Sequence, residues 1–243
     1  DELTAIFNDR SAELWIPCQL IHLSENLSDF LKTDSLSLFC LRKQAVDEGG
    51  MQLFANIEDR SYIPGKPHPN CAEYIIAVGE DGYALCMVWR KDIGGKYGFP
   101  EKKIDQMKVF INYFKNLRHS GIQPYIFYID ARWSSLLLME ALQEAQFYGV
   151  LSCSSSMKPG KLLKWMRTDL GVKDWWSIGY TPLRANLITI RTKKKVYLNI
   201  LTNWASLKAE EVWYKKRKFP AGEYSIKAPA VQKEYNIYKA KVD

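Results

Sequence analysis

Apolar and polar residues alternate along the chain from about residue 40 to residue 90, which is the period of half-buried strands. The stretch QAVDEGGMQLFANI (44–57) predicts two short extended runs that are broken at Gly49-Gly50. Two further runs, AEYIIAVG (72–79) and YALCMVW (83–89), flank an Asp-Gly dipeptide, a strong signal for a tight turn between strands. We therefore expect three strands that connect as an antiparallel meander.

The period then changes to that of helices. Residues 101–121 predict an amphipathic helix, because apolar side chains recur every three or four positions while lysines cover the other face. An apolar strand follows and ends on Asp130; a helix from about Ser134 to Tyr148, closed by Gly149, and a strand at 149–155 come next. This order of elements is that of an α/β fold, the RNase H-like (retroviral integrase-like) core with a mixed sheet and flanking helices.

The rest of the chain predicts additions to this core. Residues 1–40 predict a helical N-terminal segment, and residues 41–155 hold the core itself. Residues 156–225 are rich in Lys, Trp and strand formers, and LITIRTKKKVYLNILTN (187–203) predicts a hairpin around its lysines. We interpret 156–225 as a basic, β-rich insertion or small second domain, with a simple continuation of the sheet as the alternative. Residues 226–243 then return to the core.

Two aspartates occupy particular places in this order of strands. Asp47 lies on the first strand and Asp130 at the end of the fourth, and in this topology the two strands are neighbours, about 4.8 Å apart. Carboxylates on adjacent strands can share hard divalent cations, and two such ions about 3.5–4 Å apart stabilise the attacking and leaving oxygens of phosphoryl transfer. The alternatives for Asp130 are an ion pair with Arg132 or a helix-capping role.

The net charge favours an acidic or polyanionic partner. The formal charge is +7, and much of the excess lies in RTKKK (191–195) and WYKKRKF (213–219). Basic residues beside Trp and Tyr are typical of nucleic-acid binding, because ammonium groups neutralise phosphates and rings stack on bases. A solvated basic face is the alternative. The candidate DNA contacts in these runs are Lys193, Lys194, Lys195, Lys215, Lys216 and Arg217.

Composition disfavours several other classes of protein. No apolar run approaches the roughly 20 residues that cross a bilayer, and the start DELTAIFNDR lacks the features of a signal peptide, so we expect no membrane partner. The five cysteines form no CxxC pair and the three histidines stand apart, which argues against a thiolate zinc site and for a reduced, intracellular protein. The chain opens without methionine, which suggests a processed protein or an excised fragment.

Three segments, in order and over nearly the whole chain from residue 17, resemble the catalytic domain of piggyBac-type transposases. AVDEGGMQLFANIEDRSYIPGKPHP (45–69) resembles that family's acid-bearing strand, its Arg and its YIP-x-KP signature. YIDARWSSLLLMEAL (128–142) resembles the family's second acid, which is followed by an aromatic residue, Thr/Ser-Ser and a helix. AVQKEYNIYKAKVD (230–243) resembles the YN-x(5)-VD motif.

The resemblance implies a catalytic trio of Asp47, Asp130 and Asp243 that holds Mg²⁺ or Mn²⁺, with two ions at the site. It implies cut-and-paste DNA transposition at TTAA targets, in which an activated water nicks the DNA and the freed 3′-hydroxyl attacks phosphodiesters. The expected partner is double-stranded DNA at transposon ends and target; a homodimer in the full-length protein and a nuclear location are also expected. Arg60 and Lys66, in a Pro-Gly loop, are candidate phosphate contacts or else residues of an exposed structural loop.

Departures from the family pattern leave alternatives open. Asp59, Ala131 and Ala240-Lys241 replace the family's usual Gly, Asn and Gly-Gly, and a lysine before the last acid would pair with Asp243 and compete with metal. These changes suit a domesticated, catalytically silent copy that binds DNA or serves as a scaffold, whereas the retention of all three acids favours an active enzyme. A metal-dependent nuclease unrelated to transposition is a further alternative. Because the chain stops on Asp243, we expect it to be an excerpt of a longer protein.

Overall fold

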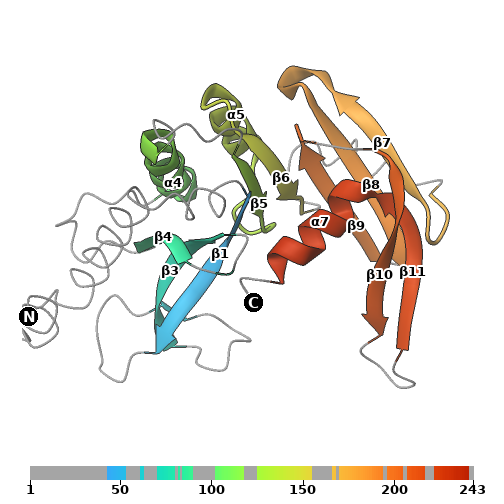
Figure 1. Cartoon of the computed structure of the whole chain (residues 1–243), viewed down its shortest axis with the longest axis horizontal. Helices are drawn as coiled ribbons and strands as arrows, with labels where there is room; N and C mark the ends of the chain where they lie inside the picture. Colours follow the sequence, from blue (N-terminus) through green and yellow to red (C-terminus); the bar gives the residue numbers. More distant parts are fainter. Residues whose placement is uncertain are drawn as a thin grey trace, which may run out of the picture. The chain divides into compact units, whose positions relative to one another are not determined.

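The computed structural model divides into two compact units. One takes its described residues from Val46–Gln123, and the other from Lys43–Ala45 and Pro124–Asp243. The structure describes residues 43–52, 61–62, 70–79, 82, 84–89, 102–117, 125–154, 166–167, 170–193, 196–204, 207–216 and 222–240 (Figure 1). The helical segment predicted within residues 1–40 lies outside these residues.

The first unit contains antiparallel strands and a helix. Its elements are β1 (Lys43–Gln52), whose first three residues belong to the second unit, β2 (Ser61–Tyr62), β3 (Asn70–Val78), β4 (Ala84–Trp89) and α4 (Lys103–Leu117). Strand β3 lies next to β1 and pairs antiparallel with both β2 and β4. The predicted hairpin is confirmed: Gly82 has a φ of +90°, which glycine adopts readily, and its N–H donates to the Gly79 carbonyl at 3.0 Å.

Strand β1 is continuous, so the predicted break at Gly49-Gly50 is wrong. The reason is packing between strands: a Cβ on Gly49 would overlap the ring of Tyr74 on β3. A glycine inside a strand often marks such a close approach by a neighbouring group. The residue that looked like a strand breaker is therefore the place where the Tyr74 ring crosses β1.

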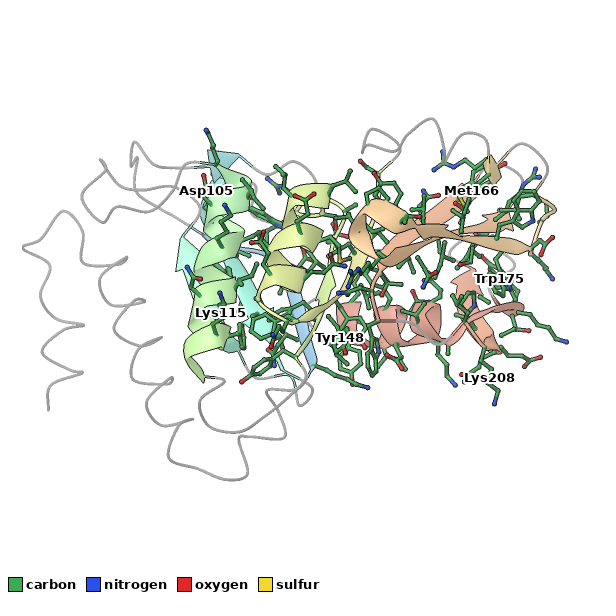
Figure 2. All side chains as sticks on the ribbon, turned by 90° about the horizontal axis from the view of Figure 1, so that it is seen from above. Asp105, Lys115, Tyr148, Met166, Trp175 and Lys208 are labelled. Carbon is green, nitrogen blue, oxygen red and sulfur yellow. The ribbon has the colours of Figure 1, made fainter. Side chains whose placement is uncertain are left out.

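Helix α4 confirms the predicted amphipathic helix. Met107, Phe110 and Phe114 are at most 2% exposed and recur at three- and four-residue steps, so they form one apolar face. Asp105 lies in the first turn and Lys115 in the last turn, at opposite ends of the helix in Figure 2. Both charges complement the helix dipole, which is positive at the N-terminus and negative at the C-terminus.

The second unit holds most of the described strands. Its elements are β5 (Ile126–Ile129), α5 (Leu136–Glu144), β6 (Tyr148–Ser152), β7 (Trp175–Tyr180), the 3₁₀ turn η2 (Thr181–Leu183), β8 (Ala185–Lys193), β9 (Val196–Thr202), β10 (Ala209–Lys216), β11 (Gly222–Pro229) and α7 (Ala230–Lys239). The strand order is β1–β5–β6–β9–β8–β7, and β1 contributes its first residues to this unit. Strands β5 and β6 are parallel, and β9 runs antiparallel to β6.

The segment interpreted as a β-rich insertion divides into two parts. Strands β8 and β9 form the predicted hairpin, and they extend the sheet through β6 together with β7. Strands β10 and β11 instead form a separate two-stranded antiparallel sheet. Helix α7 follows directly and lies beside β10 and β11 (Figure 1). Strands β7–β9 thus belong to the same sheet as β5 and β6, whereas β10 and β11 do not.

Helix α5 is shorter than predicted. It ends at Glu144, whereas the sequence pattern predicted a helix to Tyr148 with Gly149 as its stop. Gln146 adopts the left-handed φ of 58° that reverses the chain, and Tyr148 already belongs to β6. Gly149 is buried within β6, where a Cβ would lie 2.9 Å from Leu142 Cδ1, so this glycine serves helix–strand packing instead of helix termination.

A buried apolar cluster holds the second unit together. It contains Ala45, Ile126, Tyr128, Val150, Ile188, Ile190, Ile200, Val212, Ile226, Ala228, Val231, Tyr235 and Tyr238. Trp175, labelled on β7 in Figure 2, packs against this cluster. The cluster draws on the sheet, on the β10–β11 pair and on α7, which fixes α7 within this unit. In the part of the chain that the structure describes, no helix has the length and apolar character to span a membrane.

Candidate functional site

Asp130 is the first residue after the buried strand β5. The four residues of β5 are at most 3% exposed, and the chain turns immediately after Asp130. The Asp130 carbonyl accepts the N–H groups of Trp133 and Ser134, each at 3.1 Å, and Ser134 Oγ at 2.8 Å. These bonds fix the backbone of Asp130 and leave its carboxylate half-buried at the end of the strand.

The helix-capping role that was an alternative for Asp130 belongs to Ser135. The backbone of Ser135 is extended, and its Oγ accepts the N–H of Leu138 at 3.0 Å, which makes Ser135 the N-cap of α5. The carboxylate of Asp130 takes other partners.

Those partners come from α7. Asp130 Oδ1 accepts a hydrogen bond from the ammonium of Lys239, with Nζ 2.6 Å away, and a longer one from the Tyr235 hydroxyl at 3.4 Å. Burial by itself would raise the pKa of Asp130, but the Lys239 ammonium and the backbone N–H groups of Ala131 and Arg132 outweigh it and hold that pKa below its usual value. Asp130 is therefore ionised, with Lys239 as a counter-charge.

Helix α7 is held against β5 by aromatic and polar contacts. The Tyr238 ring stacks on Tyr128 with 4.4 Å between the centroids and 14° between the planes. The Tyr128 hydroxyl donates to Glu234 Oε2 at 2.6 Å. Tyr235 and Lys239, four residues apart, lie on one face of the helix, which explains why both reach Asp130.

Lys239 was not predicted as a site residue from the sequence, where Lys241 was expected to be the lysine near the acids. The signal that points to Lys239 is its spacing from Tyr235, because residues four apart share a helix face once the YN motif is placed on a helix. Lys241 and Asp243 lie outside the described residues.

Asp47 lies within β1 and belongs to the first unit, whereas Asp130 belongs to the second. Asp47 is 9% exposed, and its Oδ1 accepts the N–H of Glu48 at 2.8 Å. A carboxylate this buried is costly unless hydrogen bonds or charges stabilise it. Asp47 is thus a second acid held within a strand, as the sequence predicted.

The residue types suit a hard divalent cation, since Mg²⁺ prefers carboxylate oxygens and water. Within the described ranges, no group of three or more His, Cys, Asp or Glu side chains is placed to hold a metal ion. Asp130 Oδ1 is engaged by an ammonium group. In this structure Lys239 is therefore the cation that engages this oxygen.

Of the candidate DNA-contacting residues, three lie on described strands. Lys193 is exposed at the end of β8, and its Nζ lies 5.4 Å from the ring centroid of Tyr224. Lys215 and Lys216 lie on β10 opposite Glu223 and Gly222 of β11. The other candidates lie outside the described residues: Arg60, Lys66, Lys194, Lys195 and Arg217.

A second basic–aromatic cluster was not identified from the sequence. The guanidinium groups of Arg167 and Arg191 lie 5.0 and 5.6 Å from the ring centroid of Tyr197 on β9. Arg191 Nη1 also donates to the Leu170 carbonyl at 2.5 Å. Arg191 belongs to the predicted basic run 191–195, but its part in this cluster is structural, because it joins β8 to the segment that precedes β7.

The order of strands defines the class of fold. The order β4–β3–β1 in the first unit and β1–β5–β6 in the second, with β5 and β6 parallel, is RNase H-like. The structure of a piggyBac transposase synaptic complex with hairpin DNA matches this chain with a TM-score of 0.59 and 17% sequence identity, over 83% of this chain and 38% of that chain. The two proteins share this fold, and this chain corresponds to 38% of the piggyBac transposase chain.

The family model described as Transposase IS4 matches residues 6–243, and the chain belongs to this family. Human ENDOV is a further structural match, with 10% identity and a TM-score of 0.29 over 74% of this chain and 79% of that chain. No curated protein matches the chain in sequence.

Proposed function

We propose that this chain is the catalytic part of a piggyBac-type DNA transposase, which cleaves and joins DNA strands at TTAA targets by metal-dependent phosphoryl transfer. The observation that carries the proposal is Asp130, an ionised, half-buried carboxylate at the end of strand β5 in an RNase H-like sheet. A carboxylate buried at the end of a strand is costly in free energy unless it pairs with another charge or coordinates a metal ion. Membership of a transposase family supports the same assignment.

Asp47, Asp130 and Asp243 are the proposed ligands of Mg²⁺ or Mn²⁺, with two ions at the site. When bound, such ions activate a water molecule and stabilise the charge that develops on the phosphoryl group. The chain's own contribution is to position the acids: the turn after β5 fixes Asp130, and β1 holds Asp47 within a strand. Because the lowered pKa keeps Asp130 ionised, it need not lose a proton before it binds a cation.

Double-stranded DNA is the proposed substrate, and the basic residues of the β8–β9 and β10–β11 hairpins are the proposed contacts to its phosphates. These residues are Lys193, Lys194, Lys195, Lys215, Lys216 and Arg217, and Arg60 and Lys66 are proposed as further contacts. A homodimer of the full-length protein and a nuclear location follow from the same proposal.

Nicking of a supercoiled plasmid with TTAA sites, in Mg²⁺ or Mn²⁺, tests the proposal. The 243-residue chain should nick the plasmid, and Asp130→Asn and Asp47→Asn should each slow nicking at least ~100-fold, as loss of a group that stabilises the transition state commonly does. Asp105→Asn is the matched control, because Asp105 is a solvated acid on α4, 3.8 Å from Lys108. Equal nicking by the wild type and both site variants would contradict the proposed acids.

A catalytically silent DNA-binding or scaffold descendant is the second candidate. The ion pair between Asp130 and Lys239 favours it, because a cation from the chain already engages the acid. Such a protein would bind duplex DNA equally well with or without Asp130→Asn and would nick it with neither metal ion. Joined strands or hairpin ends among the products would separate a transposase from a nuclease that only hydrolyses.

A further inference from the structure

The contact between Lys239 and Asp130 is a short, partly buried ion pair within the second unit. The Nζ–Oδ1 distance of 2.6 Å is short even for a charge-assisted hydrogen bond. The two side chains are 38% and 24% exposed, so solvent screens the pair less than it screens a fully exposed one. This lysine is therefore not simply one of the solvated basic residues of the chain.

The helix that carries Lys239 is anchored immediately before it. Tyr238 stacks on Tyr128 of β5, and Tyr235 lies in the buried cluster while its hydroxyl points to Asp130. The Tyr128 hydroxyl ties Glu234 to the same strand. Lys239 is the last residue of α7, and its side chain is 38% exposed on a flexible four-carbon stem, so the ammonium can move away from Asp130 while these contacts persist.

We propose that Lys239 is an internal cation that competes with a divalent metal ion for Asp130, so that a metal ion binds there only after the ammonium has left Oδ1. This inference rests on the proposed function, since it takes Asp130 to be a metal ligand. The Lys239–Asp130 pair is expected to set the affinity for the metal ion and not the affinity for DNA. The Lys239 ammonium stays on Asp130 until a divalent cation replaces it.

The chemistry of the contact supports a competition. Mg²⁺ requires oxygen ligands at about 2.0–2.1 Å in near-octahedral geometry, and an ammonium on the same oxygen both repels the ion and takes up a lone pair. An opposite charge at this range lowers the affinity of a carboxylate for a proton by about one to three powers of ten. We expect an effect of similar size on its affinity for a divalent cation. Removal of Lys239 should therefore tighten metal binding by at least about tenfold.

Calorimetric titration of the 243-residue chain with Mn²⁺ tests the competition. Lys239→Gln is expected to lower the Kd for Mn²⁺ at least about tenfold, while Lys239→Arg, which keeps the cation, stays near the wild-type value. The matched control is Lys233→Gln, which removes the same charge from another lysine of α7. Lys233 pairs with Glu210 and lies about 9 Å from Lys239 along the helix. This control should change the Kd by less than about twofold.

The outcomes separate this inference from the proposed function. If the wild type and Lys239→Gln bind Mn²⁺ with the same Kd, and if Asp130→Asn abolishes binding in both backgrounds, the competition is overturned. The metal site itself would still be supported. No binding by any variant, Lys239→Gln included, would overturn both. A Kd lowered as much by Lys233→Gln would reduce the effect to overall charge and overturn the specific role of Lys239. Lys239→Met, which keeps the aliphatic stem, repeats the comparison if the Gln variant loses its native circular dichroism.

Discussion

Gly49 lies where the ring of Tyr74 crosses β1, and a Cβ at this position has no room. Gly49→Ala is expected to lower the free energy of unfolding by about 1–3 kcal/mol, because an overpacked site forces the ring or the strand to shift. Urea denaturation followed by circular dichroism measures this loss. Gly179→Ala on β7 is the control, since a Cβ there meets nothing within 4 Å. Equal losses in the two variants would contradict the packing role of Gly49.

Cys153 is a thiol whose reactivity is suppressed by burial. It is 7% exposed, and burial raises the pKa of its thiol from 9.0 to about 12. Because the thiolate is the nucleophile, we expect iodoacetamide to label Cys153 of the native chain only as fast as the chain unfolds, which peptide mass spectrometry can follow. Rapid labelling without denaturant would contradict this expectation.

The raised pKa of the Cys153 thiol also makes the stability of the chain depend on pH. The unfolded thiol ionises as the pH rises through 9.0, whereas the native thiol stays protonated until about 12. The stability linked to Cys153 is therefore complete below pH 9 and is lost progressively as the pH rises toward 12.

At the scale of elements, α5 depends on its N-cap. Ser135 Oγ accepts the N–H of Leu138 at 3.0 Å, and Ser135→Ala removes this bond. The free energy of unfolding should fall by about 1 kcal/mol, the usual cost of losing an N-cap. Ser135→Asp keeps an acceptor at the N-cap and should retain most of the stability in the same urea titration. A loss with Asp as large as that with Ala would show that another contact of Ser135 matters more.

Elements with strong local signals were predictable from the sequence. The hairpin between β3 and β4 follows from its Asp-Gly turn, and α4 follows from its apolar period. The end of α5 was not predictable, because the apolar pattern continues past Glu144. The chain leaves the helix so that Phe147 can pack edge-on against Tyr125 of the second unit, with 5.1 Å between the ring centroids. That contact is tertiary and has no signature in the local sequence.

The candidate site shows the same division. An apolar run that ends on a carboxylate predicts where Asp130 lies, and the structure places it directly after β5. Its ammonium partner, Lys239, lies 109 residues away in the chain, and no local pattern links the two. The helix-capping alternative failed because Ser135, already part of the recognised Ser-Ser pair, takes that role.

At the scale of the whole molecule, the proposed DNA binding of a chain with a charge of +7 should weaken as the salt concentration rises. Lys193 is exposed at the end of β8, so Lys193→Ala should weaken binding of any duplex sequence alike and reduce the slope of log K against log salt by about 1. Fluorescence anisotropy with labelled duplexes across a salt series measures this slope. Lys108→Ala on α4 is the control for charge alone, and an equal reduction there would remove Lys193 from the DNA contacts.

The division of β1 between the two units has a consequence for how the chain folds. Ala45 belongs to the same buried cluster as Ile126, yet all the described residues of the first unit lie between them in the sequence. Closing so long a loop costs conformational entropy before the contact repays any of it, which slows folding. During synthesis the first residues of β1 leave the ribosome early but cannot pair until β5 has been made. The two units are therefore expected to acquire their native structure together and not in the order of translation.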